Sequence, residues 1–214
     1  RACVTAGDQN VTKKTAYAYS KRLHPYVGGR RFAKGCGAQG ILRCVRAALC
    51  QGAHKRDKDI KGAHTSIAHG LLKIATRHVP IAKLRSFPSY AEYLHTPHKF
   101  MDLICAGYSC SSEQAKPLVL ARLNGGVVAN WAKKFNVSGV LPKEVQQLFT
   151  EFDLVRDILV QSRPDVLRAA TAAGSQRTEL TSFSYILCEQ EDKALRVMER
   201  VAESLGVRVE SLAF

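Results

Sequence analysis

Acidic side chains are scarce in the first half of this 214-residue chain. Residues 1–116 contain 20 Lys and Arg but only six Asp and Glu, whereas residues 117–214 contain 12 of each. The whole chain has 32 basic and 18 acidic side chains, a formal charge of +14. A purely solubilising surface would spread its charges over the chain. The confined surplus therefore favours a polyanionic partner, with nucleic acid first and an anionic membrane surface second.

Long apolar runs and regular cysteine patterns are also missing. No apolar run reaches membrane-spanning length, and the first residues lack the charged-then-apolar order of a secretory signal. The seven cysteines form no C-x-x-C pair, and their odd number argues against a disulfide framework. We expect reduced thiols, no membrane partner and an intracellular, reducing compartment, with the nucleus, a mitochondrion and a viral replication site left open. His64 and His69 lie five residues apart, not the four that align two ligands on a helix, so we expect no zinc.

The hydrophobic pattern predicts a mostly helical α+β protein. Apolar residues recur at helical spacing in most of the chain, and Pro97 separates two short helices within one of these stretches. Alternating apolar residues in 207–214 fit a strand, and Asp57 to Ile60 fit a short strand or turn that runs into a helix. The predicted helical stretches are residues 39–52, 63–75, 89–109, 113–123, 130–135, 141–162 and 182–204.

Basic and aromatic residues are interleaved in the first segment. Residues 1–38 have no sustained apolar period, so we expect a basic N-terminal arm that is mostly loop with one short helix or strand. This mixture suits contacts to a phosphate backbone together with stacking on bases, although the rings equally suit packing on the protein's own core. The basic candidates for nucleic-acid contact here and on the next helix are Arg30, Arg31, Lys34, Arg43 and Arg46.

Two aspartates, Asp57 and Asp59, stand within a group of basic residues. Carboxylates at i and i+2 of a strand project to the same side, where both are able to hold a Mg²⁺ ion that grips substrate phosphates. Divalent ions held by aspartates are the general device for in-line nucleotidyl transfer. The alternative is a pair of surface acids that offset their neighbours Lys55, Arg56 and Lys58.

The run "GRRFAKGCGAQGILRCVRAALCQGAHKRDKDIKGAHTSIAHGLL", residues 29–72, resembles polymerase-like proteins of viral and mobile-element origin. In that group a "GR.YA.G...Q...R..R..L" stretch leads into "DIDIVNAH". The second part is similar to motif A of family A DNA polymerases, a strand-to-helix site with a catalytic aspartate. The resemblance implies that Asp57 and Asp59 are catalytic and bind Mg²⁺ or Mn²⁺ weakly. It adds Gln39 and His64 to the candidates for nucleic-acid contact.

Two later segments extend the resemblance to about residues 28–214. "AKPLVLARLNGG" is similar to the fingers-helix motif, in which a triphosphate-binding lysine precedes a tyrosine by eight residues. Lys116 and Asn124 have that spacing here, and Gly125 follows, so these three residues are the nucleotide-binding candidates. The stretch 179–214 resembles the long palm helix and strand before motif C. The resemblance implies a polymerase-like unit over residues 39–214, with a small antiparallel palm-like sheet and a helical fingers-like insertion over about residues 61–180.

Four departures from the family pattern limit the expected activity. Ser112 stands at the family's arginine position, Asn124 replaces the tyrosine, and Lys61 and Gly62 replace the "VN" after motif A. The largest departure is that the motif C acid belongs directly after Phe214, where the given sequence ends. We expect a nucleic-acid-binding, polymerase-like nucleotidyltransferase domain, or a truncated or degenerate derivative, that is inactive as the isolated chain. A further polypeptide that supplies the acid is one possible partner, besides DNA or RNA. The alternative is a non-catalytic basic subunit of a ribonucleoprotein assembly such as a mitochondrial ribosome.

Overall fold

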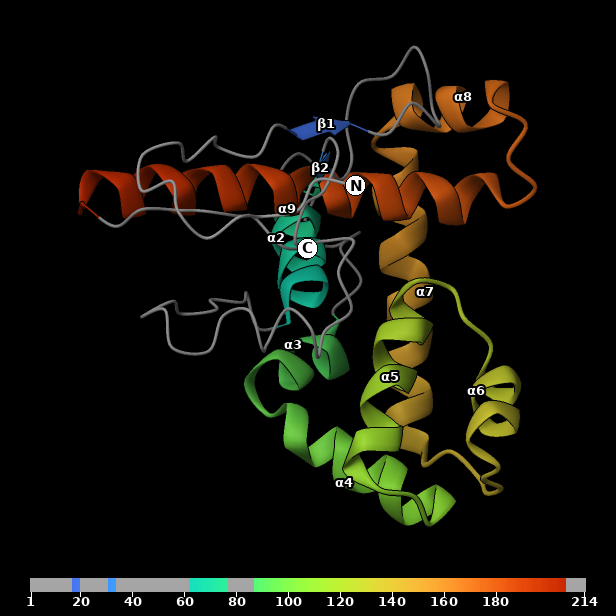
Figure 1. Ribbon diagram of the computed structural model, residues 1–214. Coiled ribbons are helices and arrows are strands. Elements are labelled where there is room, and N and C mark those ends of the chain that lie inside the picture. Colours follow the sequence, from blue (N-terminus) through green and yellow to red (C-terminus); the bar gives the residue numbers. More distant parts are fainter. Residues whose placement is uncertain (1–16, 20–30, 34–61, 77–86, 207–214) are drawn as a thin grey trace, which may run out of the picture.

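Helices make up most of the structure, a computed structural model that describes residues 17–19, 31–33, 62–76 and 87–206 (Figure 1). Two three-residue strands, β1 (Tyr17–Tyr19) and β2 (Arg31–Ala33), pair antiparallel, with Ala18 opposite Phe32. The helices in these ranges are α2 (Ala63–Ala75), α3 (Pro88–His95), α4 (Pro97–Tyr108), α5 (Ser112–Leu123), α6 (Val128–Phe135), α7 (Lys143–Gln161), α8 (Pro164–Ala172) and α9 (Thr178–Ser204).

The expected α+β fold with a palm-like sheet is wrong. Within the described residues, strands occur only as the short β1–β2 pair, and both of its members lie in the N-terminal arm. From residue 87 to residue 206 one helix follows another through short connections. The apolar residues of this stretch recur at helical spacing, and they do not alternate over a length that would form a strand. The segments 57–60 and 207–214, which were assigned to the palm strands, lie outside the described residues, as do the predicted helix 39–52 and the domain boundary at residue 38.

Helix α7 is the centre of the helical body. Leu148, Phe152 and Val155 are fully buried on it, and α7 packs against α2, α3, α4, α5, α8 and α9. In Figure 1, α9 runs crosswise past one end of α7, whereas α3, α4, α5 and α6 gather around the other end. One hydrophobic core extends from Ala68 of α2 to Leu187 of α9, so these helices form a single packed unit. No helix in the described ranges combines the length and apolarity needed to cross a membrane.

Local signals set most helix boundaries as predicted. Pro97 begins α4 directly after α3 ends, and Pro142 precedes the first turn of α7. At α5, the Ser111 hydroxyl accepts a hydrogen bond from the backbone N–H of Gln114, and the Gln114 side chain accepts one from the Ser111 N–H. This reciprocal capping box satisfies two backbone donors at the helix start. The sequence did not predict α8, and α9 begins four residues before the predicted Ser182.

A buried carboxylate joins α7 to the start of α3. Glu151 is 3% exposed, and it accepts hydrogen bonds from the backbone N–H groups of Ser89 at 3.3 Å and Tyr90 at 2.7 Å. A negative charge at a helix N-terminus is favourable because the first N–H groups have no partner inside the helix. The Tyr90 hydroxyl in turn donates to the carbonyl of Thr65 in α2. Glu151 and Tyr90 therefore tie three helices together in the core.

Replacing either of two glycines by alanine is predicted to change the free energy of unfolding, in opposite directions. A Cβ at Gly139 would lie 2.0 Å from the carbonyl oxygen of Gly107, and this backbone is held by a hydrogen bond from the Val140 N–H. A Cβ at Gly70, inside α2, would meet nothing within 4 Å. We expect Gly139→Ala to lower the free energy of unfolding by about 1–3 kcal/mol and Gly70→Ala to raise it by about 0.5–1 kcal/mol. Urea unfolding followed by circular dichroism measures both, and equal stabilities would contradict the close contact at Gly107.

Candidate functional site

Only some of the predicted site residues lie in the part of the chain that the structure describes. Arg31 is in β2, His64 is the second residue of α2, Lys116 is in α5, and Asn124 and Gly125 follow the end of α5. The other predicted site residues lie outside the described residues: Asp57, Asp59, Arg30, Lys34, Gln39, Arg43 and Arg46.

Lys116 is exposed on the outer side of α5. The residues of α5 that face the core are Ala115, Leu118, Val119 and Leu123, which leaves Lys116 directed away from it. Among the described residues Lys116 has no ion-pair partner. Its role as a triphosphate ligand stays a prediction.

Asn124 and Gly125 both have a structural role at the end of α5. The Asn124 side-chain amide donates a 2.9 Å hydrogen bond to the carbonyl of Leu120, which is one of the last carbonyls of the helix. Gly125 has a φ of +78°, and a Cβ there would lie 2.3 Å from a methyl group of Leu180 in α9. The left-handed backbone and this close contact account for glycine at position 125 without any nucleotide.

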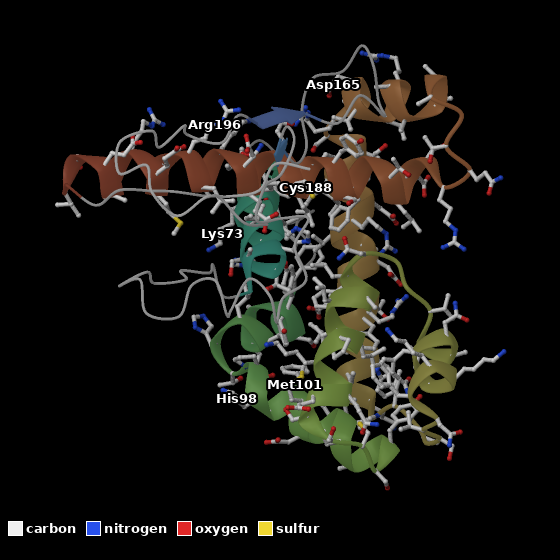
Figure 2. The ribbon with its side chains drawn as sticks, in the orientation of Figure 1. Lys73, His98, Met101, Asp165, Cys188 and Arg196 are labelled. Atoms are coloured by element: carbon white, nitrogen blue, oxygen red, sulfur yellow. The ribbon has the colours of Figure 1, made fainter. Side chains whose placement is uncertain are left out.

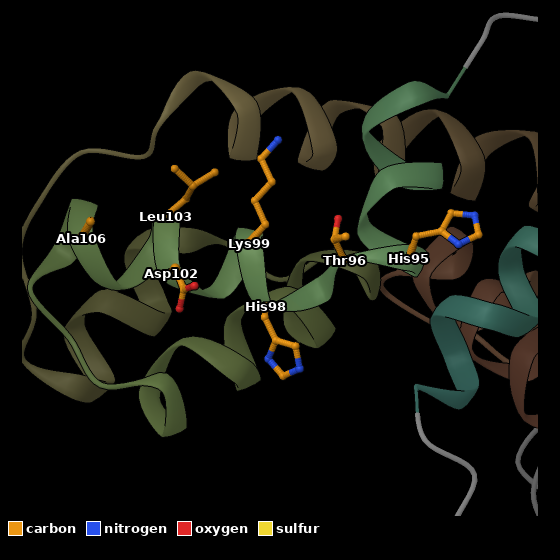
Figure 3. A pocket seen from close by; sticks show the side chains of 7 residues that line it. All are labelled: His95, Thr96, His98, Lys99, Asp102, Leu103 and Ala106. Atoms are coloured by element: carbon orange, nitrogen blue, oxygen red, sulfur yellow. The ribbon is translucent and has the colours of Figure 1, made fainter.

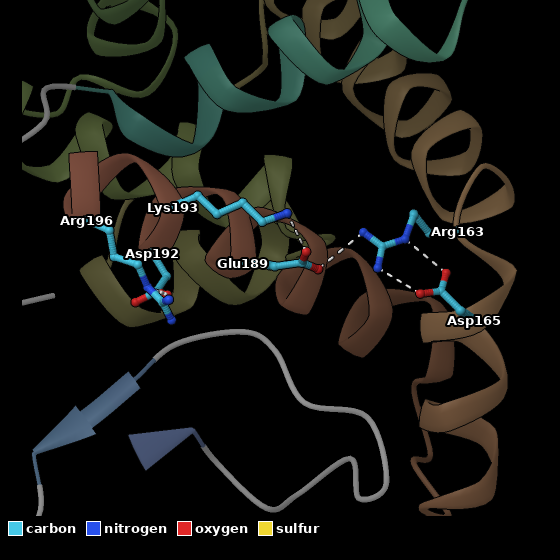
Figure 4. Close-up of polar contacts among 6 residues, drawn as sticks. All are labelled: Arg163, Asp165, Glu189, Asp192, Lys193 and Arg196. Carbon is cyan, nitrogen blue, oxygen red and sulfur yellow. Dashed lines mark hydrogen bonds and ion pairs between the residues drawn. The ribbon is translucent and has the colours of Figure 1, made fainter. Parts of the chain in front are cut away.

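Ion pairs connect α9 to the start of α8. Arg163 binds Asp165 at 2.8 Å and Glu189 at 3.2 Å, and Lys193 binds the other oxygen of Glu189 at 2.7 Å (Figure 4). Hydrogen bonding to Arg163 is the main cause that lowers the pKa of the Asp165 carboxyl. One helical turn further on α9, Arg196 binds the buried Asp192 at 3.0 Å. Glu189 and Asp192 of α9 therefore form ion pairs with basic side chains of the same chain.

A histidine, a cysteine and a glutamate meet where α2 contacts α9. His64 comes from α2, and Cys188 and Glu191 are one turn apart on α9. Figure 2 labels Cys188 on α9. One ligand atom from each residue lies within 4.8 Å of the other two, and His64 Nε2 lies 3.5 Å from Glu191 Oε2. The side chains of His64 and Glu191 are 16% and 14% exposed. This group is the densest meeting of potential metal ligands in the described part of the chain.

The His64 imidazole lies in an electronegative and largely dry environment. The Cys188 side chain and then the Glu191 carboxylate raise the pKa of His64 to about 9, although burial acts in the opposite direction. Both ring nitrogens are buried, and neither has a hydrogen-bond partner at ordinary geometry. Sequence reasoning missed Cys188 and Glu191 because a cysteine and a glutamate three residues apart on a helix are common. Only the fold brings them to a histidine more than 120 residues away.

A shallow hollow at the α3–α4 junction is a weaker candidate. His95, Thr96, His98, Lys99 and Asp102 line much of it (Figure 3). His98 and Asp102 project to one side, whereas Lys99 projects to the other. The Lys99 ammonium also pairs with Glu92 at 2.6 Å. Ligand sites generally have a few polar groups that converge on one point, and this hollow has none that do.

Comparison with known proteins assigns no family to the chain. No protein-family model matches it, and no curated protein or solved structure matches it significantly. The functional argument therefore depends on the residues and geometry described above.

Proposed function

We propose that the chain is a nucleic-acid-binding protein whose basic upstream segment holds the phosphate backbone. The observation that carries this proposal is the separation of charge between that segment and the helical body. The 62 residues before α2 contain 14 Lys and Arg against three Asp and Glu, whereas the helical body, residues 63–76 and 87–206, contains 14 of each. A concentrated positive charge of this kind attracts a polyanion and releases its counterions.

The helical body supports the proposal because it neutralises its own charges. Asp153 of α7 binds Arg122 of α5 at 2.8 Å and Arg156 at 2.6 Å. Arg122 also donates to the carbonyl of Gly126, and its guanidinium lies 5.4 Å from the centre of the Phe149 ring. Arg122 and Arg156 therefore make contacts inside the helical body. The basic side chains upstream of the body are therefore the ones that supply the net charge for a partner.

Two double substitutions that remove equal charge test this proposal. Arg43→Gln with Arg46→Gln changes the upstream segment, and Lys133→Gln with Lys134→Gln changes two exposed residues of α6. We expect the arginine pair to weaken binding to a labelled oligonucleotide about tenfold or more and to reduce the salt slope by about 2. The lysine pair should have little effect. Equal weakening by both pairs in a fluorescence anisotropy titration would show that only total charge matters.

A second candidate function is nucleotidyl transfer, and the observation that favours it is the exposed Lys116, which forms no ion pair within the described residues. In this proposal Asp57 and Asp59 hold Mg²⁺ or Mn²⁺ loosely, and Lys116 binds the triphosphate of an incoming nucleotide. Two ions are needed to activate the attacking hydroxyl and to neutralise the leaving group. A further polypeptide that supplies the motif C acid would complete the site.

Manganese titration distinguishes this candidate from a purely structural role. We expect Mn²⁺ to bind the full chain more tightly when nucleotide is present, because phosphate oxygens complete the coordination that two carboxylates begin. Asp57→Asn and Asp59→Asn should remove this effect, and Asp102→Asn, an exposed residue of α4, should not. If all variants bind alike, the aspartates only balance charge and the ribonucleoprotein subunit is the better description. Primer extension by the isolated chain would show that no further acid is needed.

A further inference from the structure

We propose that His64, Cys188 and Glu191 form a zinc site that fastens α2 to α9. The three side chains come from two helices that pack against each other, and they meet in a largely buried position. The proposal does not use Asp57 or Asp59, and it assigns His64, which the family resemblance placed among the nucleic-acid contacts, to a metal instead. The spacing of His64 and His69 does not indicate zinc, and Cys188 and Glu191 lie far from both in the sequence.

The spacing of the donor atoms suits tetrahedral zinc. Bond lengths of about 2.0–2.3 Å at tetrahedral angles place neighbouring ligand atoms about 3.3–3.8 Å apart. His64 Nε2 and Glu191 Oε2 are separated by 3.5 Å, and every pair of donor atoms in the group lies within 4.8 Å. Cys188 and Glu191 are three residues apart on α9, so both project from the same face of that helix.

The chemistry of the donors favours zinc over magnesium or calcium. A thiolate and an imidazole are typical zinc ligands, whereas magnesium and calcium take oxygen ligands almost exclusively. A dication would neutralise the Cys188 thiolate and the Glu191 carboxylate together. It would also bind a ring nitrogen of His64, and both ring nitrogens are buried. Three protein ligands leave the fourth tetrahedral position to water or another donor.

The competing explanation is a simple ion pair between a protonated His64 and Glu191. That pair would use the same 3.5 Å approach, but it would have no need of the Cys188 sulfur. Zinc, in contrast, requires the thiolate as a ligand. The participation of Cys188 therefore separates the two explanations.

Cobalt(II) is the spectroscopic probe for this site. The full chain is reduced, freed of metal with a chelator and titrated with Co²⁺, and we expect one equivalent to produce a thiolate-to-cobalt charge-transfer band that Zn²⁺ abolishes. Cys188→Ser should lose the band, whereas Cys110→Ser, which changes a cysteine of the α4–α5 connection, should keep it. His64→Gln and Glu191→Gln should each lower metal affinity at least ~100-fold, because even the loss of an indirect contact to a zinc ligand costs 10–100-fold.

A second measurement uses the unchanged chain, so its result does not depend on whether the variants fold. Stoichiometric Zn²⁺ should slow alkylation of Cys188 by iodoacetamide at least ~100-fold, as mass spectrometry of its peptide would show, while Cys105 and Cys110 keep their rates. Circular dichroism checks that each variant remains helical. A parent chain without a thiolate band, a Cys188→Ser variant that keeps the band, or unprotected Cys188 would overturn the zinc site. The three residues would then be an ion pair with a neighbouring thiol.

Discussion

Raising the salt concentration from about 50 mM to about 200 mM should weaken nucleic-acid binding by this chain about 10³-fold or more. Residues 1–62 hold 14 Lys and Arg, and a protein in which only about six such residues reach phosphates already falls in this range. Each phosphate that is neutralised releases condensed counterions, and added salt opposes that release. Fluorescence anisotropy with a labelled oligonucleotide at several salt concentrations gives the slope directly.

An oligonucleotide with an uncharged methylphosphonate backbone is the matched control. It keeps the bases and therefore any stacking on aromatic side chains, but it has no counterions to release. We expect it to bind weakly at every salt concentration. A salt slope near zero for the natural oligonucleotide, or equal binding of the two backbones, would show that phosphate contacts do not dominate.

The local features of the fold could be predicted from the sequence. Apolar residues at helical spacing identified α2 and α7, and Pro97 correctly divided α3 from α4. The capping box of Ser111 and Gln114 is equally local, because the two residues are only three positions apart. These signals depend on neighbours within one or two helical turns, and the sequence shows such neighbours directly.

The features that depend on distant residues could not be predicted. Glu151 caps α3 from the middle of α7, some 60 residues along the chain, and nothing near Glu151 in the sequence indicates this role. Cys188 and Glu191 become potential ligands only because α9 crosses α2 at His64. The palm-like sheet was predicted from a family resemblance and not from a sustained strand pattern, and the described residues contain no such sheet.

Replacing Phe152 by alanine should cause the largest loss of stability of any single change considered. Phe152 is fully buried on α7, with the Tyr90 ring centre 5.1 Å away and the Phe149 ring centre 6.1 Å away. Such a substitution removes buried area and leaves a cavity, which together cost about 3–5 kcal/mol. A small domain is stable by only about 5–15 kcal/mol, so this loss is a large fraction of the total stability.

Urea unfolding followed by circular dichroism measures this loss, with Leu120→Ala as the control. Leu120 is a large apolar residue of α5 that is 50% exposed, so its truncation should change the free energy of unfolding by no more than about 1 kcal/mol. If Phe152→Ala and Leu120→Ala have similar midpoints, α7 does not form the centre of the core.

Deletion of residues 1–35 tests the central claim most directly, because it removes eight Lys and Arg and leaves every helix of the described body in the chain. The full chain and the shortened chain are titrated with the same oligonucleotide at low salt and at several higher concentrations. The account predicts that the shortened chain binds at least ~100-fold more weakly at low salt and with a smaller salt slope. Unchanged affinity and an unchanged slope would contradict the claim that the basic upstream segment holds nucleic acid.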